Sequence, residues 1–217
     1  MVNTHVVVKE FLVDGPPEAS HLFVFAHGAG AGMATPFMES IAQGIAAAGI
    51  RVVRFHFPYM EESVRGGRRL PPNGGRILRA CFSEVIEHCV RKEGCPRNQL
   101  VIGGKSMGGR VASMIADEQQ VAGVACMGYP FHPPRQPGRL RTDHLAVLRT
   151  PMLICQGERD RFGNRAEVEN YRLSPAVRLD WMPDGDHDFT PRKSSGLTPA
   201  HNLRDAAAAA SAFILGL

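Results

Sequence analysis

The sequence predicts an α/β fold with a mainly parallel central sheet and helices on both of its faces. Short apolar runs alternate along the chain with longer segments whose apolar residues recur at helical spacing. No linker or internal repeat divides the 217 residues, which suit one domain over 1–217. One apolar run passes through a glycine-rich turn directly into a helix-like segment, and loops at the carboxyl ends of parallel strands are where function is expected.

The individual elements follow from these patterns. Strands are expected at 6–13, 21–26, 51–55, 100–102, 121–127, 152–156 and 177–182. Helices are expected at 37–48, 76–92, 110–117 and 200–217, the last of them favoured by its many alanines. Segment 61–75 is rich in Gly, Pro and Arg and is expected to be the longest irregular stretch.

The composition, with 44% hydrophobic and 21% charged residues, is that of an ordinary soluble globular protein. Five scattered cysteines without a Cys-x-x-Cys pair argue against a disulfide framework or a zinc site. Neither a secretory signal nor a membrane span is visible, so we expect a cytoplasmic location and no membrane partner. The net charge of +4 is mild, and the arginines lack interleaved aromatic residues, so no nucleic-acid partner is expected.

The most informative motif is Gly-x-Ser-x-Gly at 104–108, between the strand at 100–102 and the helix at 110–117. In a nucleophile elbow, a serine on a strained strand-to-helix turn exposes its hydroxyl, and the flanking glycines avoid collisions with neighbouring backbone. The strand before the motif and the helix after it make Ser106 the expected nucleophile.

Two nucleotide-binding interpretations fail on position. A phosphate-binding P-loop ending in Gly104-Lys105-Ser106 requires a glycine where Gln99 stands. A dinucleotide fingerprint beginning at Gly28-Ala29-Gly30 would place its third glycine at Met33. We therefore expect no nucleotide cofactor.

A serine nucleophile needs a base and a carboxylate that orients the base, in the chain order Ser, Asp or Glu, His. Asp160 follows the strand at 152–156 and is favoured over its neighbour Glu158. His187 follows the last strand and precedes the last helix. The other histidines considered precede the motif, lie in a proline-rich loop or open the last helix: His56, His88, His132 and His201.

The backbone N–H of Met107 and an N–H of the glycine-rich loop at Gly28 or Ala29 are the expected oxyanion-hole donors. An ordinary glycine-rich turn is the alternative for that loop. Arginines also gather in segments expected to be loops, which indicates either a solvated basic surface or a rim that attracts anionic substrates. The candidate rim residues are Arg68, Arg69, His132 and Arg135.

Together, the loop 27–30, the motif 104–108, the segment 157–160 and Asp186-His187 resemble the α/β-hydrolase superfamily over nearly the whole chain. The segments 129–134 and 141–145 look like a small capless branch close to dienelactone hydrolases, which includes a hydrolase-like domain in a subunit of a chromatin acetyltransferase complex. The resemblance implies that Ser106, Asp160 and His187 are catalytic. Dienelactone hydrolases use a cysteine nucleophile, however, and Ser106 is a serine.

Between the strands at 121–127 and 152–156, where caps usually insert, only about two dozen residues remain, with one short helix expected at 143–148. An open site without a lid suits compact acyl esters. We expect a serine hydrolase that cleaves small soluble carboxylic esters or thioesters without a metal or cofactor. A catalytically silent binding or scaffold protein of the same fold is the alternative, peptidase activity is less favoured, and the oligomeric state is open.

Overall fold

The computed structural model describes residues 10–217, and the beginning of the strand expected at 6–13 lies outside the described residues. Seven strands form one sheet in the order β1-β3-β2-β4-β5-β6-β7. Only β1 runs antiparallel to its neighbour, and the other neighbours pair in parallel. The strands are β1 (Phe11–Asp14), β2 (Leu22–Ala26), β3 (Arg51–Phe55), β4 (Leu100–Lys105), β5 (Gly123–Met127), β6 (Met152–Gly157) and β7 (Val177–Met182).

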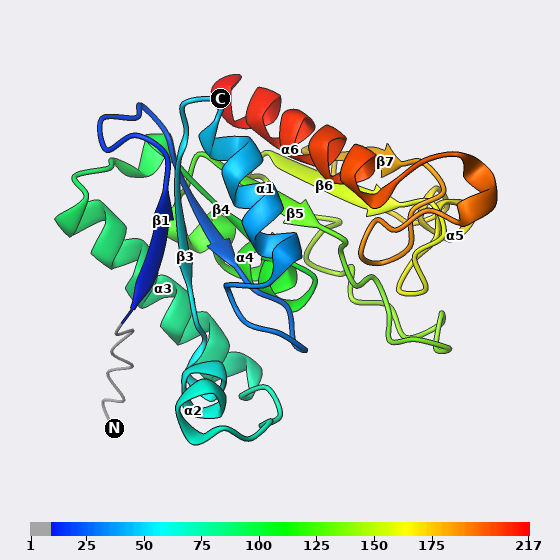
Figure 1. Cartoon of the computed structure of the whole chain (residues 1–217), viewed down its shortest axis with the longest axis horizontal. Coiled ribbons are helices and arrows are strands. Elements are labelled where there is room, and N and C mark those ends of the chain that lie inside the picture. The colour runs from blue at the N-terminus through cyan, green and yellow to red at the C-terminus, as the bar shows by residue number, and fades with distance from the viewer. Residues whose placement is uncertain (1–9) are drawn as a thin grey trace.

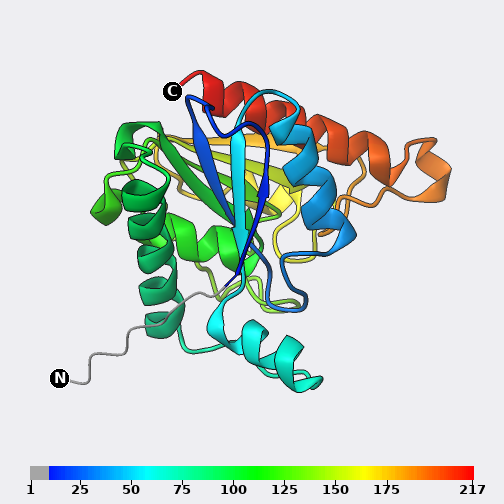
Figure 2. The same cartoon turned by 60° about the vertical axis from the view of Figure 1, so that its left-hand side comes forward.

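Helices cover both faces of the sheet, as Figures 1 and 2 show. On one face α1 (Pro36–Ala46) and α6 (Pro199–Leu215) lie side by side, and on the other face α3 (Gly75–Lys92) packs against α4 (Met107–Gln119). Two short helices, α2 (Pro58–Gly66) and α5 (Arg165–Val168), complete the set of α-helices in the described chain. The predicted fold class is confirmed.

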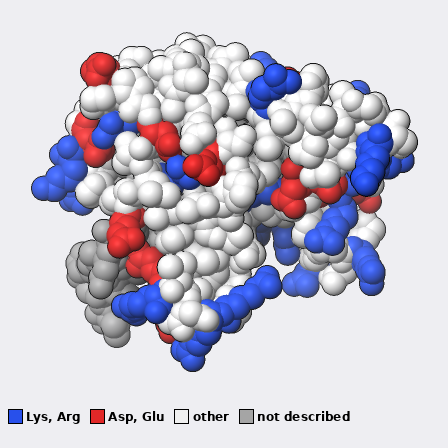
Figure 3. All heavy atoms as spheres, in the orientation of Figure 1, with Lys and Arg blue, Asp and Glu red and all other residues white. Residues whose placement is uncertain are grey.

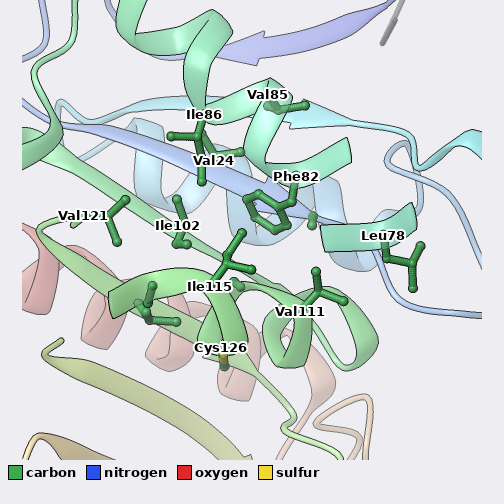
Figure 4. Packing of buried hydrophobic residues seen from close by; sticks show 14 of the residues in the cluster. Val24, Leu78, Phe82, Val85, Ile86, Ile102, Val111, Ile115, Val121 and Cys126 are labelled. Atoms are coloured by element: carbon green, nitrogen blue, oxygen red, sulfur yellow. The ribbon is translucent and has the colours of Figure 1, made fainter. Parts of the chain in front are cut away.

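The two hydrophobic cores arise from the alternation of side chains along β2. Phe23 and Phe25 point to the face covered by α1 and α6, where they join Ile41. Val24 points to the opposite face and packs with Phe82 of α3, as Figure 4 shows. Both faces are covered, so the central strands β2, β4 and β5 are buried along their whole length and are mostly apolar rather than alternating with polar residues.

The expectation of an irregular segment over 61–75 is wrong for its first part, because α2 occupies Pro58–Gly66. Pro58 occupies the first turn of this helix, where a missing N–H costs no hydrogen bond. Gly67 ends the helix in the left-handed conformation with φ 62°. Pro58 therefore begins a helix rather than an irregular segment.

The segment between β5 and β6 contains no helix or strand among its residues, 128–151, all of which the structure describes. The helix expected at 143–148 is wrong: the segment forms turns, and the carbonyl of Leu145 accepts from the amide of Ser174 instead of continuing a helix. The absence of a sizeable cap is confirmed. The carboxyl ends of β4, β6 and β7 thus lie at one uncovered edge of the sheet (Figure 1).

Candidate active site

Ser106 lies between β4 and α4 with φ 51° and ψ −112°, a strained conformation for a residue with a side chain. The two glycines of the motif make this turn possible. A Cβ on Gly104 would lie 2.4 Å from the carbonyl oxygen of Ala26, and one on Gly108 would lie 2.5 Å from the same oxygen. The turn therefore packs directly on the end of β2, and the Ser106 hydroxyl projects from the edge of the sheet.

The structure brings Ser106, His187 and Asp160 together in one hydrogen-bonded row. The Nε2 atom of His187 lies 2.9 Å from Oγ of Ser106, and its Nδ1 lies 2.7 Å from Oδ2 of Asp160. With the ring proton on Nδ1 donated to the carboxylate, Nε2 is free to accept the serine proton. The three residues follow β4, β7 and β6 respectively, and this is the juxtaposition that their chain order predicts.

Asp160, rather than Glu158, orients the histidine. Asp160 is fully buried, and its carboxylate also accepts from the amide of Phe162 at 2.8 Å and from Nε2 of Gln156 at 3.0 Å. Glu158 accepts instead from the amide of Asp184 and from Arg165. These hydrogen bonds, led by the one from the Asp184 amide, lower the pKa of Glu158.

A hollow of about 480 Å³ opens in front of the serine and histidine. Ser106 and His187 lie in its wall, and the ring of Phe162 packs 4.3 Å from the imidazole centroid. The remaining lining comes mainly from the glycine-rich loop and the start of α1: Gly28, Ala29, Gly30, Ala31, Thr35, Pro36, Phe37 and Met38, with Lys105, Arg161 and Asp188.

Met107, whose amide was predicted as an oxyanion donor, is the first residue of α4. An amide at that position has no partner within its own helix, and the helix dipole adds positive potential there. In the glycine-rich loop, the carbonyls of Gly28 and Ala29 accept hydrogen bonds from the Tyr59 hydroxyl, both at 3.2 Å. Because these oxygens are held by Tyr59, the loop is fixed in one orientation beside Ser106.

His27 fixes the same loop from within the core. Its Nδ1 donates to the Gly28 carbonyl at 2.7 Å, and its Nε2 accepts from the amide of Phe57 at 3.1 Å. Burial lowers the pKa of His27 to about 4, so the ring stays neutral and keeps this pattern. The sequence offered no signal for the role of Tyr59, because its contacts are with residues about 30 positions away along the chain.

Of the predicted rim residues, Arg68 and Arg69 lie near the site. Arg69 lines hollows of about 460 and 270 Å³, and Arg68 lines only the smaller one; both hollows share Ala29 and Gly30 with the one at Ser106. Figure 3 shows Lys and Arg side chains gathered over the α2 region at the lower edge of the molecule.

His132 does not belong to the rim. It is 2% exposed, and its ring contacts the Pro133 carbonyl and Glu167. Arg135 is exposed in the following loop and lines none of these three hollows. The expectation for a rim here does not hold because the first residues of the proline-rich segment are buried, and its exposed part lies away from these hollows.

A second serine–histidine contact occurs deeper in the molecule, where Oγ of Ser113 lies 2.9 Å from Nε2 of His144. The Ser113 hydroxyl donates to the carbonyl of Arg110 at 2.9 Å, which leaves the ring nitrogen as the donor to the serine oxygen. Burial, together with the nearby charge of Arg110, lowers the pKa of His144 to about 4. This pair lines none of the three hollows.

Over residues 10–217, no group of three or more His, Cys, Asp or Glu side chains is arranged to hold a metal ion. Nor does that part of the chain include a helix of the length and apolarity needed to cross a membrane.

The fold and site define an α/β hydrolase. The model of the alpha/beta hydrolase domain family matches residues 19–215, so the chain belongs to this family. Among solved structures, an alpha-beta serine hydrolase homologue from Coxiella burnetii is 19% identical, with a TM-score of 0.70 over 92% of this chain and 90% of the other.

Two further solved structures are similar to the chain. The dienelactone hydrolase from Anabaena variabilis is 21% identical, with a TM-score of 0.72 over 95% of this chain and 90% of that one. An α/β serine hydrolase without lid from Xanthomonas campestris is 19% identical, with a TM-score of 0.68 over 95% and 88% of the two chains. The predicted resemblance to capless, dienelactone hydrolase-like proteins is confirmed at the level of the fold.

Proposed function

We propose that the protein is a serine hydrolase that cleaves carboxylic esters or thioesters of small molecules through an acyl-enzyme on Ser106. The row of contacts from Ser106 Oγ through the His187 ring to the buried Asp160 carboxylate carries this proposal. In this mechanism His187 removes the serine proton as the hydroxyl attacks the acyl carbon, and the imidazolium then protonates the leaving group. Asp160 holds the ring in the required tautomer throughout.

In the proposed mechanism, the amides of Met107 and of the loop at Gly28 and Ala29 stabilise the oxyanion of the tetrahedral intermediate. Removing one such donor typically costs about 3–4 kcal/mol of transition-state stabilisation. The Tyr59 and His27 contacts support this role because they hold the loop before substrate arrives. Water, activated by His187, then releases the acyl group and restores the serine.

We further propose that the substrates are compact and that anionic ones are favoured. The hollow is open and small, and Arg161 lies in its wall while Arg68 and Arg69 line the adjoining hollows. Charge reversal at Arg68 and Arg69 is expected to weaken turnover of carboxylate-bearing esters about tenfold. An equal loss for neutral esters would contradict a role in charge recognition.

Covalent labelling by a fluorophosphonate tests the proposed nucleophile. We expect rapid labelling of the wild type and none of Ser106→Ala, with Ser113→Ala as the matched control that is labelled normally. A folded wild-type protein that remains unlabelled would favour the scaffold alternative.

Substrate class is tested by a series of p-nitrophenyl esters of increasing chain length beside a set of acyl-CoA thioesters and model amides. Compact acyl groups are expected to give the highest kcat/KM. A preference for amides would contradict the esterase assignment.

A further inference from the structure

Lys105 is a buried charged residue for which the proposed mechanism has no use. It is the last residue of β4 and directly precedes Ser106, and its side chain is only 9% exposed. Burying an ammonium group is costly unless charged or polar partners compensate. Burial accordingly lowers the pKa of Lys105, while Asp188 and Asp160 oppose that effect. The partners of this group indicate what it does.

The ammonium of Lys105 binds the loop that carries His187. Nζ donates to the main-chain carbonyl of His187 itself and lies 3.2 Å from Oδ1 of Asp188. It also lies over the ring of Phe37, 4.8 Å from the centroid, and 5.7 Å from that of Phe189. Such cation–π contacts help to compensate a desolvated ammonium.

The rest of the loop is held from the other side. Nδ2 of Asn202, on α6, donates to the carbonyls of Pro183 and Phe189, and the Asp186 carboxylate accepts from the amides of Asp188 and Thr190. These bonds shape the loop but do not connect it to the nucleophile. Lys105 does, because its backbone is joined to Ser106 and its side chain reaches the backbone of His187.

We propose that Lys105 is a positioning residue that sets the distance between the Ser106 hydroxyl and the His187 ring. This inference rests on the proposed function, since it assigns a role within the same site. Small displacements of a base from its nucleophile are costly: about 1 Å can reduce the rate about 100-fold. The contact of the Lys105 ammonium with the His187 backbone opposes such a displacement, because Lys105 is bonded directly to Ser106.

A substrate anion is not the partner that Lys105 is arranged to bind. Its ammonium already contacts the Asp188 carboxylate and the His187 carbonyl. Arg161, in the same wall, has only the ring of Phe162 as a partner within residues 10–217, with no ion pair or hydrogen bond of its own. An anionic substrate would contact Arg161, whereas the ammonium of Lys105 binds the loop that carries His187.

The first experiment compares Lys105→Met with Lys193→Met, which removes the same charge from an exposed position. With p-nitrophenyl acetate as the substrate, we expect Lys105→Met to lower kcat about 10–100-fold and to change KM less than about twofold. Lys193→Met should match the wild type. Asp188→Asn, at a side chain that is 70% exposed, should lower kcat severalfold without unfolding the protein.

Chemical rescue separates a tether from a general contribution to stability. In Lys105→Ala, n-propylammonium ions added to the solution replace the missing part of the side chain, which borders the open hollow. We expect a saturable recovery of the fluorophosphonate labelling rate of at least about fivefold. The labelling rate is used because amines cleave p-nitrophenyl esters directly. Wild type should show no recovery.

Two results would overturn the inference. One is a wild-type kcat in Lys105→Met; the other is a loss in which KM rises while kcat is unchanged, which indicates substrate binding. If Lys105→Met does not fold, an unchanged kcat in Asp188→Asn would likewise contradict it. Failure of the proposed function is distinguishable, because the folded wild type would then neither turn over the ester nor be labelled, or Ser106→Ala would retain the activity.

Discussion

Two of the serine–histidine contacts within residues 10–217 have the same length, and in only one of these two is the ring nitrogen free to accept the serine proton. Ser106 and His187 lie 2.9 Å apart at the edge of the sheet, and Ser113 and His144 lie 2.9 Å apart beneath it. In the first pair the Asp160 carboxylate takes the ring N–H, so that the far nitrogen accepts the serine proton. In the second, the serine proton is donated to a carbonyl. In each pair, a third group sets the direction of the serine–histidine hydrogen bond. That direction distinguishes a histidine that can act as a base from one that makes only a structural contact.

The largest effect on kcat is expected when the Ser106 hydroxyl is removed, and removal of the Ser113 hydroxyl serves as the comparison. Ser106→Ala is expected to lower kcat for a p-nitrophenyl ester by on the order of 10⁴-fold or more, because the covalent route is lost. Ser113→Ala should change kcat less than about twofold. Steady-state kinetics of both variants measures this, and comparable losses would show that the two pairs are not functionally distinct.

The orienting carboxylate gives the next effect. Asp160→Asn should lower kcat roughly 10³–10⁴-fold, because an amide in that position favours the wrong tautomer of His187. Glu158→Gln serves as the control, since its carboxylate binds Asp184 and Arg165 rather than the ring. The comparison requires single-turnover rates, and a small effect of Asp160→Asn would mean that the base is oriented in another way.

Loosening the glycine-rich loop at Gly28 and Ala29 should lower kcat by a smaller factor. Tyr59→Phe removes a hydroxyl that holds the carbonyls of Gly28 and Ala29, so we expect kcat to fall about tenfold with little change in KM. The free energy of unfolding should fall by about 1 kcal/mol, because the Ala29 carbonyl loses this hydrogen bond while the Gly28 carbonyl keeps the one from His27. An unchanged kcat with lowered stability would limit Tyr59 to a structural role.

The smallest effect concerns acid stability. Burial lowers the pKa of His144 to about 4, below the 6.5 of an unperturbed histidine, so the unfolded chain binds more protons between these values. The contribution of this residue is complete above about pH 6.5 and is lost as the pH falls towards 4. His144→Gln should flatten the fall in Tm over this range by about 2–4 °C. Burial lowers the pKa of His27 and of His56 in the same direction, so an unchanged slope would show that His144 contributes nothing to the acid sensitivity.

Much of this architecture is predictable from the sequence because the signals are local. The buried strands are continuous apolar runs, and the elbow needs glycines within two residues of Ser106. The chain order of Ser106, Asp160 and His187 was enough to predict that they lie close together, because the parallel strands before them end at the same edge of the sheet. What escaped prediction depends on distant contacts. Tyr59 reaches a loop about 30 residues away, and Lys105 reaches a loop 82 residues away.

Some local signals were also missed. The start of α2 at Pro58 has the favourable first-turn proline, and α5 begins with a capping box formed by Asn164 and Glu167. Both helices are short, so their apolar periodicity is too brief to detect. The opposite error is the helix expected at 143–148, where the chain forms turns.

The lack of a cap between β5 and β6 also affects how an acyl group bound to Ser106 would react. In the proposed mechanism, bulk water would reach the Ser106 ester from the open side of the site, at a concentration that no competing alcohol or amine matches in solution. A site that is not closed against solvent does not protect a reactive intermediate from water. Such a scaffold favours hydrolysis over the transfer of the group to another acceptor.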